Sequence, residues 1–593
     1  MTSTTTMRLP IRPALCAALL AVAAQNPAQA QTREEITRVP IAPVPQSAPR
    51  SITVDDGLER APCPLAGPQF AAVEVTLDRV DFGGLEHLPA GLLDSAARPW
   101  LGQRIPISTL CEVRDRAAAI LRTKGYLAAV RLPPQTIDGG TVRFDVLLAR
   151  ITGFQVRGNA GRAEGLIAGY LEAIRSQPVF NLLEAERYLL LARDIPGHDV
   201  RMTLRPAGTG QGEVIGEVMV THTPVMVEAN VQNYGSQATG RIGGLVQARL
   251  NGVILPGDQT RIAYYGTADF KEQHVLQVGE QVRIGREGLT VSADFVHAWT
   301  RPAIAPGLDL RSKTWVATLA ARYPLVRRQA RNLALGGGFE AVNQDITVGG
   351  LPLSMDKLRV GFVRADFDAV DPASLTSASG FTFAEPRWRL NGSAELRQGL
   401  SVLGASEDCG PGLARCRLPG VVPPSRLEAD PTAFVARAQV TGEVRLLPVL
   451  GFQLSARGQY AKKPLLSFEE FSAGNFTVGR GFDPGIIAGD SGLGLSGELR
   501  YGRLVPANDR ATAWQVYGFV DQAWVWNRDS ARVIGFREQL TSAGGGLRLA
   551  WGDRMLLDAG AAVPLARTGG QAKRGDVRVL LNLTARLVPW DRR

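Results

Sequence analysis

The chain has 593 residues, a formal net charge of +10, 45% hydrophobic residues and five cysteines. This length exceeds one compact core, so two or more domains are expected. The arginines and lysines are spread along the chain rather than clustered, which argues against nucleic-acid binding. The five histidines are scattered and no Cys-x-x-Cys pair occurs, so neither a metal site nor a cofactor is expected.

The first thirty residues have the pattern of a targeting segment. Two arginines precede an apolar run over residues 13–24, which is too short to span a bilayer. Ala28-Gln29-Ala30 has the small-x-small pattern of a signal-peptidase site. We therefore predict a signal peptide over residues 1–30 and export from the cytoplasm. No later stretch approaches eighteen apolar residues, so no transmembrane helix is expected after cleavage.

Residues 31–69 are rich in proline and are predicted to be an extended linker, with helix-forming residues only in a short REEITR stretch. Four cysteines remain after cleavage, and an even number in an exported chain suggests disulfides. Cys409 and Cys416 lie in one Gly/Pro-rich loop and are expected to form a local bridge. Cys63 and Cys111 could pair with each other.

Two copies of one β-α-α-β-β plan follow, over residues 70–150 and 151–222. The first has a strand at 71–80, a helical pattern at 107–125 and strands at 126–133 and 141–149. The second has strands at 151–159, 199–207 and 213–222, with helices at 163–176 and 182–195. Each copy is predicted to be a small α+β domain.

Residues 223–593 lose the helical pattern and show a succession of short alternating segments. VRVLLNLTARLV at 577–588 alternates apolar with mostly polar side chains, and WQVYGFVDQAWVW at 514–526 separates two faces in the same way. A soluble β-sandwich and a transmembrane barrel both give such alternation. The length of the segment, aromatic residues near strand ends and recurrent arginines on the polar face favour the barrel, with some sixteen strands.

An exported chain with two such repeats and a C-terminal barrel resembles the TpsB transporters of two-partner secretion, the FhaC/ShlB-like haemolysin secretion/activation proteins. The repeats resemble POTRA domains. GYLAAVRLPPQ at 125–135 resembles the end of a first POTRA domain, and Asn233-Tyr234-Gly235 with Thr239-Gly240 resembles the opening of the barrel. VGRGF at 478–482 matches the VRGY/F loop motif with one extra glycine, and FVDQA at 519–523 matches the F-x-D-x-G strand motif with alanine in place of glycine.

The resemblance implies a specific contact. In this family the VRGY/F segment is the tip of a long extracellular loop that folds back into the barrel, where its arginine pairs with the aspartate of the strand motif. Arg480 should therefore pair with Asp521, and a bidentate carboxylate is the partner that a confined arginine needs. The remaining motif positions are Val478, Gly479, Gly481 and Phe482 in the loop, and Phe519 and Ala523 in the strand. The methyl group of Ala523 is expected to enter a wide lumen.

The same loop contains Gly489-Asp490-Ser491-Gly492, which is similar to the segment that carries the nucleophile of trypsin-like proteases. A serine nucleophile needs a histidine base, and no histidine follows residue 297. We therefore interpret the segment as the polar, flexible return of the loop into the next strand, and we expect no enzymatic activity.

The resemblance implies an outer-membrane translocase whose POTRA domains face the periplasm. They would bind a large unfolded TpsA-like exoprotein of the haemagglutinin or haemolysin type, which then crosses the barrel without ATP. The barrel would contact outer-membrane lipid and lipopolysaccharide. Family members carry an N-terminal helix that plugs the pore, and the proline-rich residues 31–60 argue against one here. A BamA-like insertase, a passive porin-type channel and an exported adhesin are the alternatives.

Overall fold

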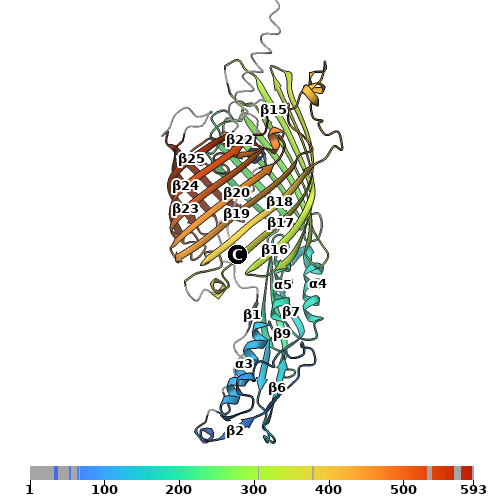
Figure 1. Ribbon diagram of the computed structural model, residues 1–593, viewed down its shortest axis with the longest axis vertical. Helices are drawn as coiled ribbons and strands as arrows, with labels where there is room; N and C mark the ends of the chain where they lie inside the picture. Colours follow the sequence, from blue (N-terminus) through green and yellow to red (C-terminus); the bar gives the residue numbers. More distant parts are fainter. Residues whose placement is uncertain are drawn as a thin grey trace, which may run out of the picture.

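The computed structural model describes residues 32–37, 52–54, 63–65, 67–304, 306–376, 380–529, 537–566 and 576–589. Two small α+β units lie below a large β-barrel (Figure 1). None of the described helices combines the length and the apolar composition that a membrane span requires. The signal peptide predicted over residues 1–30 lies outside the described residues.

The first unit packs one long helix on two small sheets. Its elements are η3 (Pro68–Phe70), β2 (Glu74–Leu77), β3 (Arg79–Gly83), η4 (Arg98–Trp100), β4 (Gln103–Pro106), α3 (Thr109–Thr123), β5 (Ala128–Arg131) and β6 (Thr141–Leu148). Helix α3 buries Leu110, Val113 and Leu121 at helical spacing against the strands. The prediction of two helices in this copy was wrong for the described residues, because residues 85–101 form turns and η4. Pro89 and Pro99 each remove a backbone donor from that stretch.

The second unit follows the predicted plan. Its elements are β7 (Arg150–Gly158), η5 (Gly161–Ala163), α4 (Glu164–Arg175), α5 (Leu182–Arg193), β8 (His198–Pro206) and β9 (Glu213–His222). The strand order is β1-β8-β9-β7, and β1 (Ile52–Val54) pairs parallel to β8. The segment 31–69 is therefore not all extended linker, since it contributes β1 to this sheet and the short helix α2 (Arg33–Ile36).

Within the described residues, sixteen strands close a barrel, which confirms the predicted architecture. They are β10 (Val225–Gln232), β11 (Gly243–Asn251), β12 (Gln259–Thr267), β13 (Gln273–Ile284), β14 (Leu289–Thr300), β15 (Leu310–Arg327), β16 (Arg331–Val348), β17 (Leu351–Val370), β18 (Trp388–Gly399), β19 (Phe434–Leu447), β20 (Leu450–Ala461), β23 (Ser491–Arg503), β24 (Thr512–Trp526), β25 (Arg537–Trp551), β26 (Met555–Pro564) and β27 (Arg578–Val588). Neighbours are antiparallel, and β10 pairs with β27 to close the cylinder.

We call the barrel edge beside the two units the near rim, where β10 begins and β27 ends. The opposite edge, where β10 ends and β27 begins, is the far rim. Short 3-10 turns lie in the connections: η6 (Pro372–Thr376) at the near rim, and η7 (Pro411–Leu413) and η8 (Arg415–Arg417) at the far rim.

Side chains alternate between the two faces of the wall. In β27, Val579 and Leu581 are exposed on the outside, whereas Leu580 and Arg586 are buried on the inside. Strand β24 alternates in the same way along its length. Exposed aromatic residues gather near the near-rim ends of strands: Trp388, Tyr501, Trp514 and Trp551. An apolar exterior with aromatic residues near the strand ends is the pattern of a transmembrane barrel.

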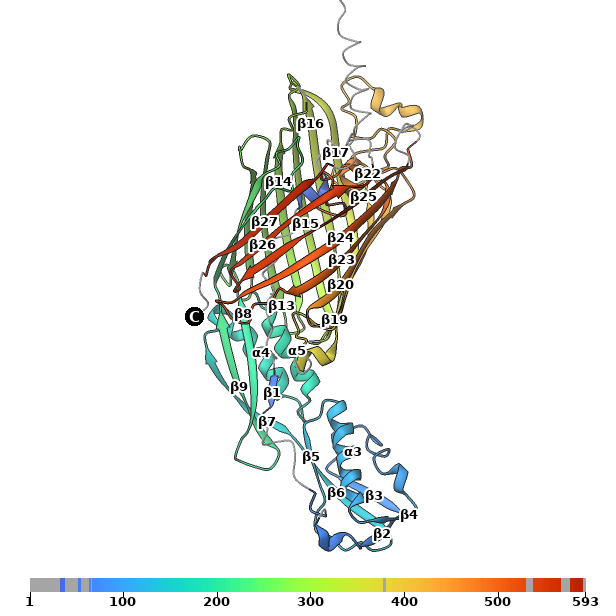
Figure 2. The ribbon, with the colours of Figure 1, turned by 90° about the vertical axis from the view of Figure 1, so that its left-hand side faces the viewer.

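The second unit is held against the near rim by its helix α5 and the turn that follows it (Figure 2). Asp194 forms a bidentate ion pair with Arg327 at the end of β15, with both N–O distances 2.7 Å. Arg283 donates to the carbonyl oxygen of the same Asp194 at 2.7 Å. Arg187 of α5 pairs with Glu287 at 3.1 Å. These contacts fix how the unit meets the barrel.

Candidate functional site

The candidate site is built by the loop of residues 462–490, which joins β20 to β23 at the far rim and folds into the barrel. It carries η9 (Ser467–Glu469) and a hairpin of β21 (Phe471–Ala473) and β22 (Ile487–Gly489), of which β22 is labelled in Figure 1. Apolar side chains of the loop pack on the inner wall. Phe471, Val478, Phe482 and Ile487 form one buried cluster with Ala523 and Val525 of β24 and Leu540 of β25.

At the tip of this loop the structure places Arg480 against Asp521, the partner expected for it. The guanidinium makes a bidentate contact, at 3.1 Å and 2.9 Å, and the Arg480 backbone N–H donates to the same carboxylate at 2.9 Å. Glu498 accepts a further bond from Arg480 at 2.8 Å, and the ring centroid of Phe519 lies 3.4 Å from the guanidinium carbon. Burial alone would lower the pKa of Arg480, but the hydrogen bonds to Asp521 and Glu498 outweigh burial and raise it.

The other motif residues explain why the tip fits this wall. Gly479 has a φ of +118°, and a Cβ there would meet Leu540 at 2.6 Å. A Cβ on Gly481 would lie 2.9 Å from the Ser542 side chain and 3.0 Å from the backbone nitrogen of Pro564 in β26. Ala523 is fully buried in the loop–wall cluster, so the expectation that its methyl enters a wide lumen was wrong. The loop itself covers that position.

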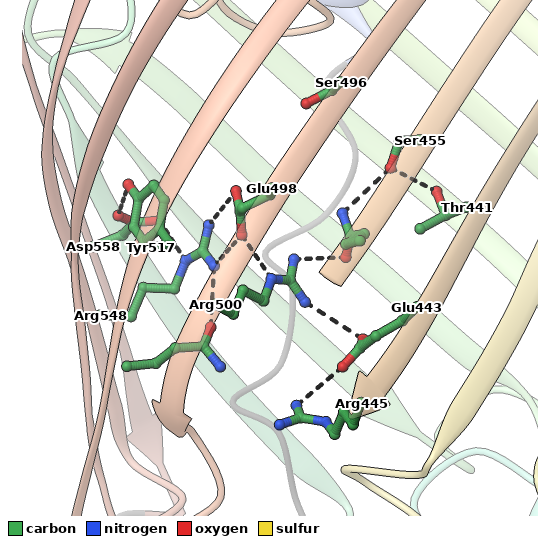
Figure 3. A network of polar contacts seen from close by, with 12 residues as sticks. Thr441, Glu443, Arg445, Ser455, Ser496, Glu498, Arg500, Tyr517, Arg548 and Asp558 are labelled. Carbon is green, nitrogen blue, oxygen red and sulfur yellow. Dashed lines mark hydrogen bonds and ion pairs between the residues drawn. The ribbon is translucent and has the colours of Figure 1, made fainter. Parts of the chain in front are cut away.

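Through Glu498, the tip also joins a charged network on the inner wall, and Figure 3 shows the wall residues of this network. Glu498 accepts bonds from Arg548 at 2.6 Å and from Arg500 at 2.7 Å, besides the bond from Arg480. Arg500 continues to Glu443 at 3.4 Å, and Glu443 pairs with Arg445 at 3.0 Å. Alternating charges thus line the wall from β25 to β19, as suits a hydrated lumen.

Helix α2 lies inside the barrel beside the loop, where it appears as a short blue segment in Figure 2. Thr32 and Glu35 form a capping box. Arg33 pairs with Glu340 of β16 and with Glu469 of the loop. Glu34 pairs with Arg457 of β20 at 2.6 Å and accepts a bond from Ser472 of β21 at 2.7 Å. Residues 32–37 therefore lie in the lumen, although the sequence argued against a plug.

The two ends of the inserted loop are joined by Arg426, which comes from the far-rim loop 400–433. Its guanidinium pairs with Glu470, at the start of the hairpin, at 2.8 Å and with Asp490, at the end of the hairpin. It also pairs with Asp529 of the next far-rim loop at 3.0 Å. All four side chains are buried. Arg426 thus fixes the base of the hairpin at Glu470 and Asp490, which we call the neck of the loop.

The protease-like segment belongs to this neck. Asp490 is fully buried, and its carboxylate accepts bonds from the backbone N–H groups of Leu465 and Arg528 at 2.7 and 2.6 Å. The Ser491 hydroxyl bonds the backbone of Ala461. The prediction of a flexible return was therefore wrong, because these groups fix the corner at which β23 begins.

Both expected cysteine pairs are bonded. Cys63 is joined to Cys111 in α3, with Cα atoms 5.9 Å apart, and ties residue 63 to the first unit. Cys409 is joined to Cys416 within loop 400–433. Among the described residues, no group of three or more His, Cys, Asp or Glu is placed to hold a metal ion.

Sequence reasoning missed two parts of the site. The contacts of Arg426 join segments more than forty residues apart and leave no local pattern. Helix α2 did have a signal, since Thr32-Arg-Glu-Glu35 is a capping-box sequence, but its four helical residues are too few to predict a stable helix.

Comparison with known proteins assigns this architecture to a family. The family model for the haemolysin secretion/activation protein ShlB/FhaC/HecB matches residues 214–549, more than half of the chain. The model for the ShlB-type POTRA domain matches residues 75–148, within the first unit.

Comparisons with individual proteins agree with this family assignment. The chain is 23% identical over 436 residues to the outer membrane transporter CdiB-2 of Burkholderia pseudomallei, covering 71% of this chain and 68% of the relative. The solved structure of CdiB from Escherichia coli aligns with a TM-score of 0.68 at 18% identity, over 99% of this chain and 100% of the other. CdiB from Acinetobacter baumannii aligns with a TM-score of 0.62 at 17% identity, over 86% and 90%. At these identities the two structures establish the shared fold.

Proposed function

The chain belongs to the ShlB/FhaC/HecB family of haemolysin secretion/activation proteins, outer-membrane transporters of a TpsA-type exoprotein, and we propose how its residues carry that exoprotein across. The POTRA units face the periplasm in this family, so the near rim is periplasmic and the far rim extracellular. The observation that carries the proposal is the barrel with the loop 462–490 packed inside it beside α2.

Capture begins at the POTRA units in this proposal. Strand β7 ends the sheet of the second unit, and β5 ends the sheet β3-β6-β5 of the first. An extended segment of the exoprotein can add to such an edge through main-chain hydrogen bonds, with little demand on its sequence. The exposed Val156 on β7 offers an apolar contact for alternate side chains.

Passage then uses the lumen. An unfolded chain exposes its peptide groups, and these need polar or hydrated surroundings throughout the crossing. The wall of paired charges around Glu443, Glu498 and Arg500 provides such surroundings. The chain contains no nucleotide-binding motif, so we propose that folding of the exoprotein outside the cell biases its movement outward.

Arg480 and Asp521 act in this scheme as a latch that keeps the inserted loop on the wall of β23 to β25. Asp521 and Glu498 are both buried, so the loop arginine is needed to compensate them. When the pair holds the tip, the loop stays in one position on one side of the lumen. The exoprotein then passes beside the loop.

The test compares culture medium and outer membrane, with and without this gene, by protein mass spectrometry. Loss of one large protein from the medium, with the membrane proteins unchanged, is the expected result and identifies the exoprotein. Loss of several barrel proteins from the membrane would instead identify a BamA-like insertase. An unchanged medium, together with reduced uptake of small solutes, would identify a passive channel.

A further inference from the structure

The contact between the first and last barrel strands, which we call the seam, is short. Strand β10 pairs with β27 from Val227 opposite Val588 to Gln232 opposite Asn582, with an irregularity next to Val227. Strands β16 and β17 pair much further, from Arg331 opposite Ala369 to Val348 opposite Leu351. Paired residues contribute backbone hydrogen bonds, so fewer such bonds hold β10 to β27 than hold β16 to β17.

Side chains reinforce the seam at its far-rim end. Asn233, just after β10, donates to the carbonyl of Val579 at 3.0 Å and accepts from the N–H of Leu581 at 2.8 Å. Arg578, the first residue of β27, donates to the carbonyls of Tyr234 and Gly235 at 3.1 and 2.9 Å. These bonds extend the pairing beyond the strands themselves.

Asp483 of the inserted loop meets both sides of this end of the seam. Its carboxylate accepts from Arg578 of β27 at 2.5 Å. On the other side it accepts from Arg241 at 3.4 Å and from the backbone N–H of Gln237 at 3.2 Å, both in the loop that follows β10. One loop carboxylate therefore connects the last strand, β27, to the loop that follows the first strand, β10.

The position of Asp483 follows from the latch. Arg480 is fixed on β23 and β24, and the Gly481 N–H donates to Ser542 of β25 at 3.3 Å. A Cβ on Gly481 would lie 3.0 Å from the backbone nitrogen of Pro564 in β26, so the tip packs closely on that strand as well. Three residues after Arg480, the chain reaches β27 and the loop after β10. The tip thus lies along the inner face of the wall, from β23 to the seam.

The carboxylate of Asp483 also compensates two positive charges. Arg578 is only 8% exposed, and Arg241 shares its carboxylate partner, so two positive groups converge on Asp483. A cavity of about 290 Å³ adjoins them, and its lining includes the polar residues Asn233, Arg241, Asp483, Asp576 and Arg578 besides Val577 and Val579. Without the Asp483 charge, two cations would face each other across the far-rim end of the seam, and like charges at such range repel.

We propose that Asp483 is a positioning residue that keeps the seam closed at its far-rim end, so that the inserted loop links the latch to barrel closure. This role goes beyond export. It assigns to the loop a second fixed point, distinct from the pair of Arg480 and Asp521.

The test uses a cysteine pair across the seam, Gln232→Cys with Asn582→Cys, whose backbones are directly opposite. After mild oxidation of the full-length protein in the membrane and denaturation, free thiols are counted with a PEG-maleimide. The pair should oxidise almost completely with Asp483 present, and Asp483→Asn should lower its oxidation rate roughly tenfold. Asp408→Asn, in another far-rim loop where Asp408 pairs with Arg415 at 2.9 Å, is the matched control and should change nothing.

An unchanged rate in Asp483→Asn would overturn the proposal. If that variant does not assemble, the double variant with Arg241→Gln decides, because it removes one of the two facing cations. Restored assembly supports the proposal, and equal failure of both variants overturns it. The readout needs no exoprotein, so its outcome is independent of the export experiment.

Discussion

Replacing Arg480 by alanine removes the partner of two buried carboxylates at once. Asp521 is 1% exposed and Glu498 is also buried, and the lost guanidinium makes the bidentate contact to Asp521, a bond to Glu498 and a stacking contact with Phe519. Glu498 keeps Arg500 and Arg548, so the main loss falls on Asp521. Breaking a buried pair in this way costs about 3–5 kcal/mol.

That cost applies to the equilibrium between the loop seated on the wall and the loop detached from it. Since about 1.4 kcal/mol changes an equilibrium tenfold, Arg480→Ala should shift the ratio of seated to detached loop by roughly 10²- to 10⁴-fold. We expect export of the exoprotein to be abolished while the barrel still assembles. Arg480→Lys keeps a charge but loses the bidentate contact, so export should fall to an intermediate level.

The assay measures exoprotein in the medium by immunoblot, with barrel assembly checked by the mobility of the unheated protein on gels. Arg364→Ala is the matched control, because Arg364 is also an arginine of the inner wall but pairs with the less buried Asp366 at 2.8 Å. Export at the native level from an assembled Arg480→Ala barrel would refute the latch. An equal loss in Arg364→Ala would show that the effect is not specific to the tip.

Three further predictions concern the neck of the loop and α2. Arg426→Ala leaves the fully buried Asp490 without its main cation, so the loop 462–490 should become sensitive to protease added to intact cells, and an unchanged digestion pattern would contradict this. Ile36→Glu places a charge in an apolar cluster, so α2 should detach and single-channel conductance in planar bilayers should rise; equal conductance would show that α2 does not obstruct the lumen. Burial alone would raise the pKa of Glu34, but the ion pair with Arg457 lowers it below the ordinary value of about 4.3. A carboxyl with a lowered pKa stabilises the folded state above its ordinary pKa and loses that contribution as the pH falls through the lowered value, so conductance should be constant between about pH 7 and 5 and rise below about pH 4. A rise already between pH 7 and 6 would count against this assignment.

The barrel could be predicted because its signal is local. Each strand repeats with period two, so Val579 and Leu581 are assigned to one face and Arg586 to the other without knowledge of the neighbouring strands. The pair of Arg480 and Asp521 is separated by 41 residues, and only the resemblance of its two motifs to a known family related them. Physical reasoning then explained why a confined arginine needs a carboxylate partner, but it could not show which carboxylate lies next to Arg480.

The predictions for α2 and for the segment before Ser491 were wrong for the same reason, because tertiary contacts determine the structure of both segments. Helix α2 has four residues and would not form alone, and it is stabilised by ion pairs to Glu340, Arg457 and Glu469 that the sequence does not place. The segment before Ser491 has the composition of a flexible turn, but the burial of Asp490 against Arg426 fixes it. Composition describes what a segment does in isolation, and both segments are enclosed by the barrel.

A loop fixed inside the barrel narrows the path of a polypeptide, but the fixed loop and the path lie in different parts of the lumen. The loop tip lies on β23 to β26 and reaches the seam, whereas Ile36 of α2 packs in a cluster that joins the opposite strands β11 to β17 to Leu466 and Phe468 of the loop. Helix α2 therefore fills the space between the loop and the opposite wall. Its departure frees that space without breaking the contacts of Arg480 or Asp483, since none of these involves α2. In the scheme that we propose, export requires the loop to stay attached and α2 to leave, so Arg480→Ala and Ile36→Glu should change export and conductance in different ways.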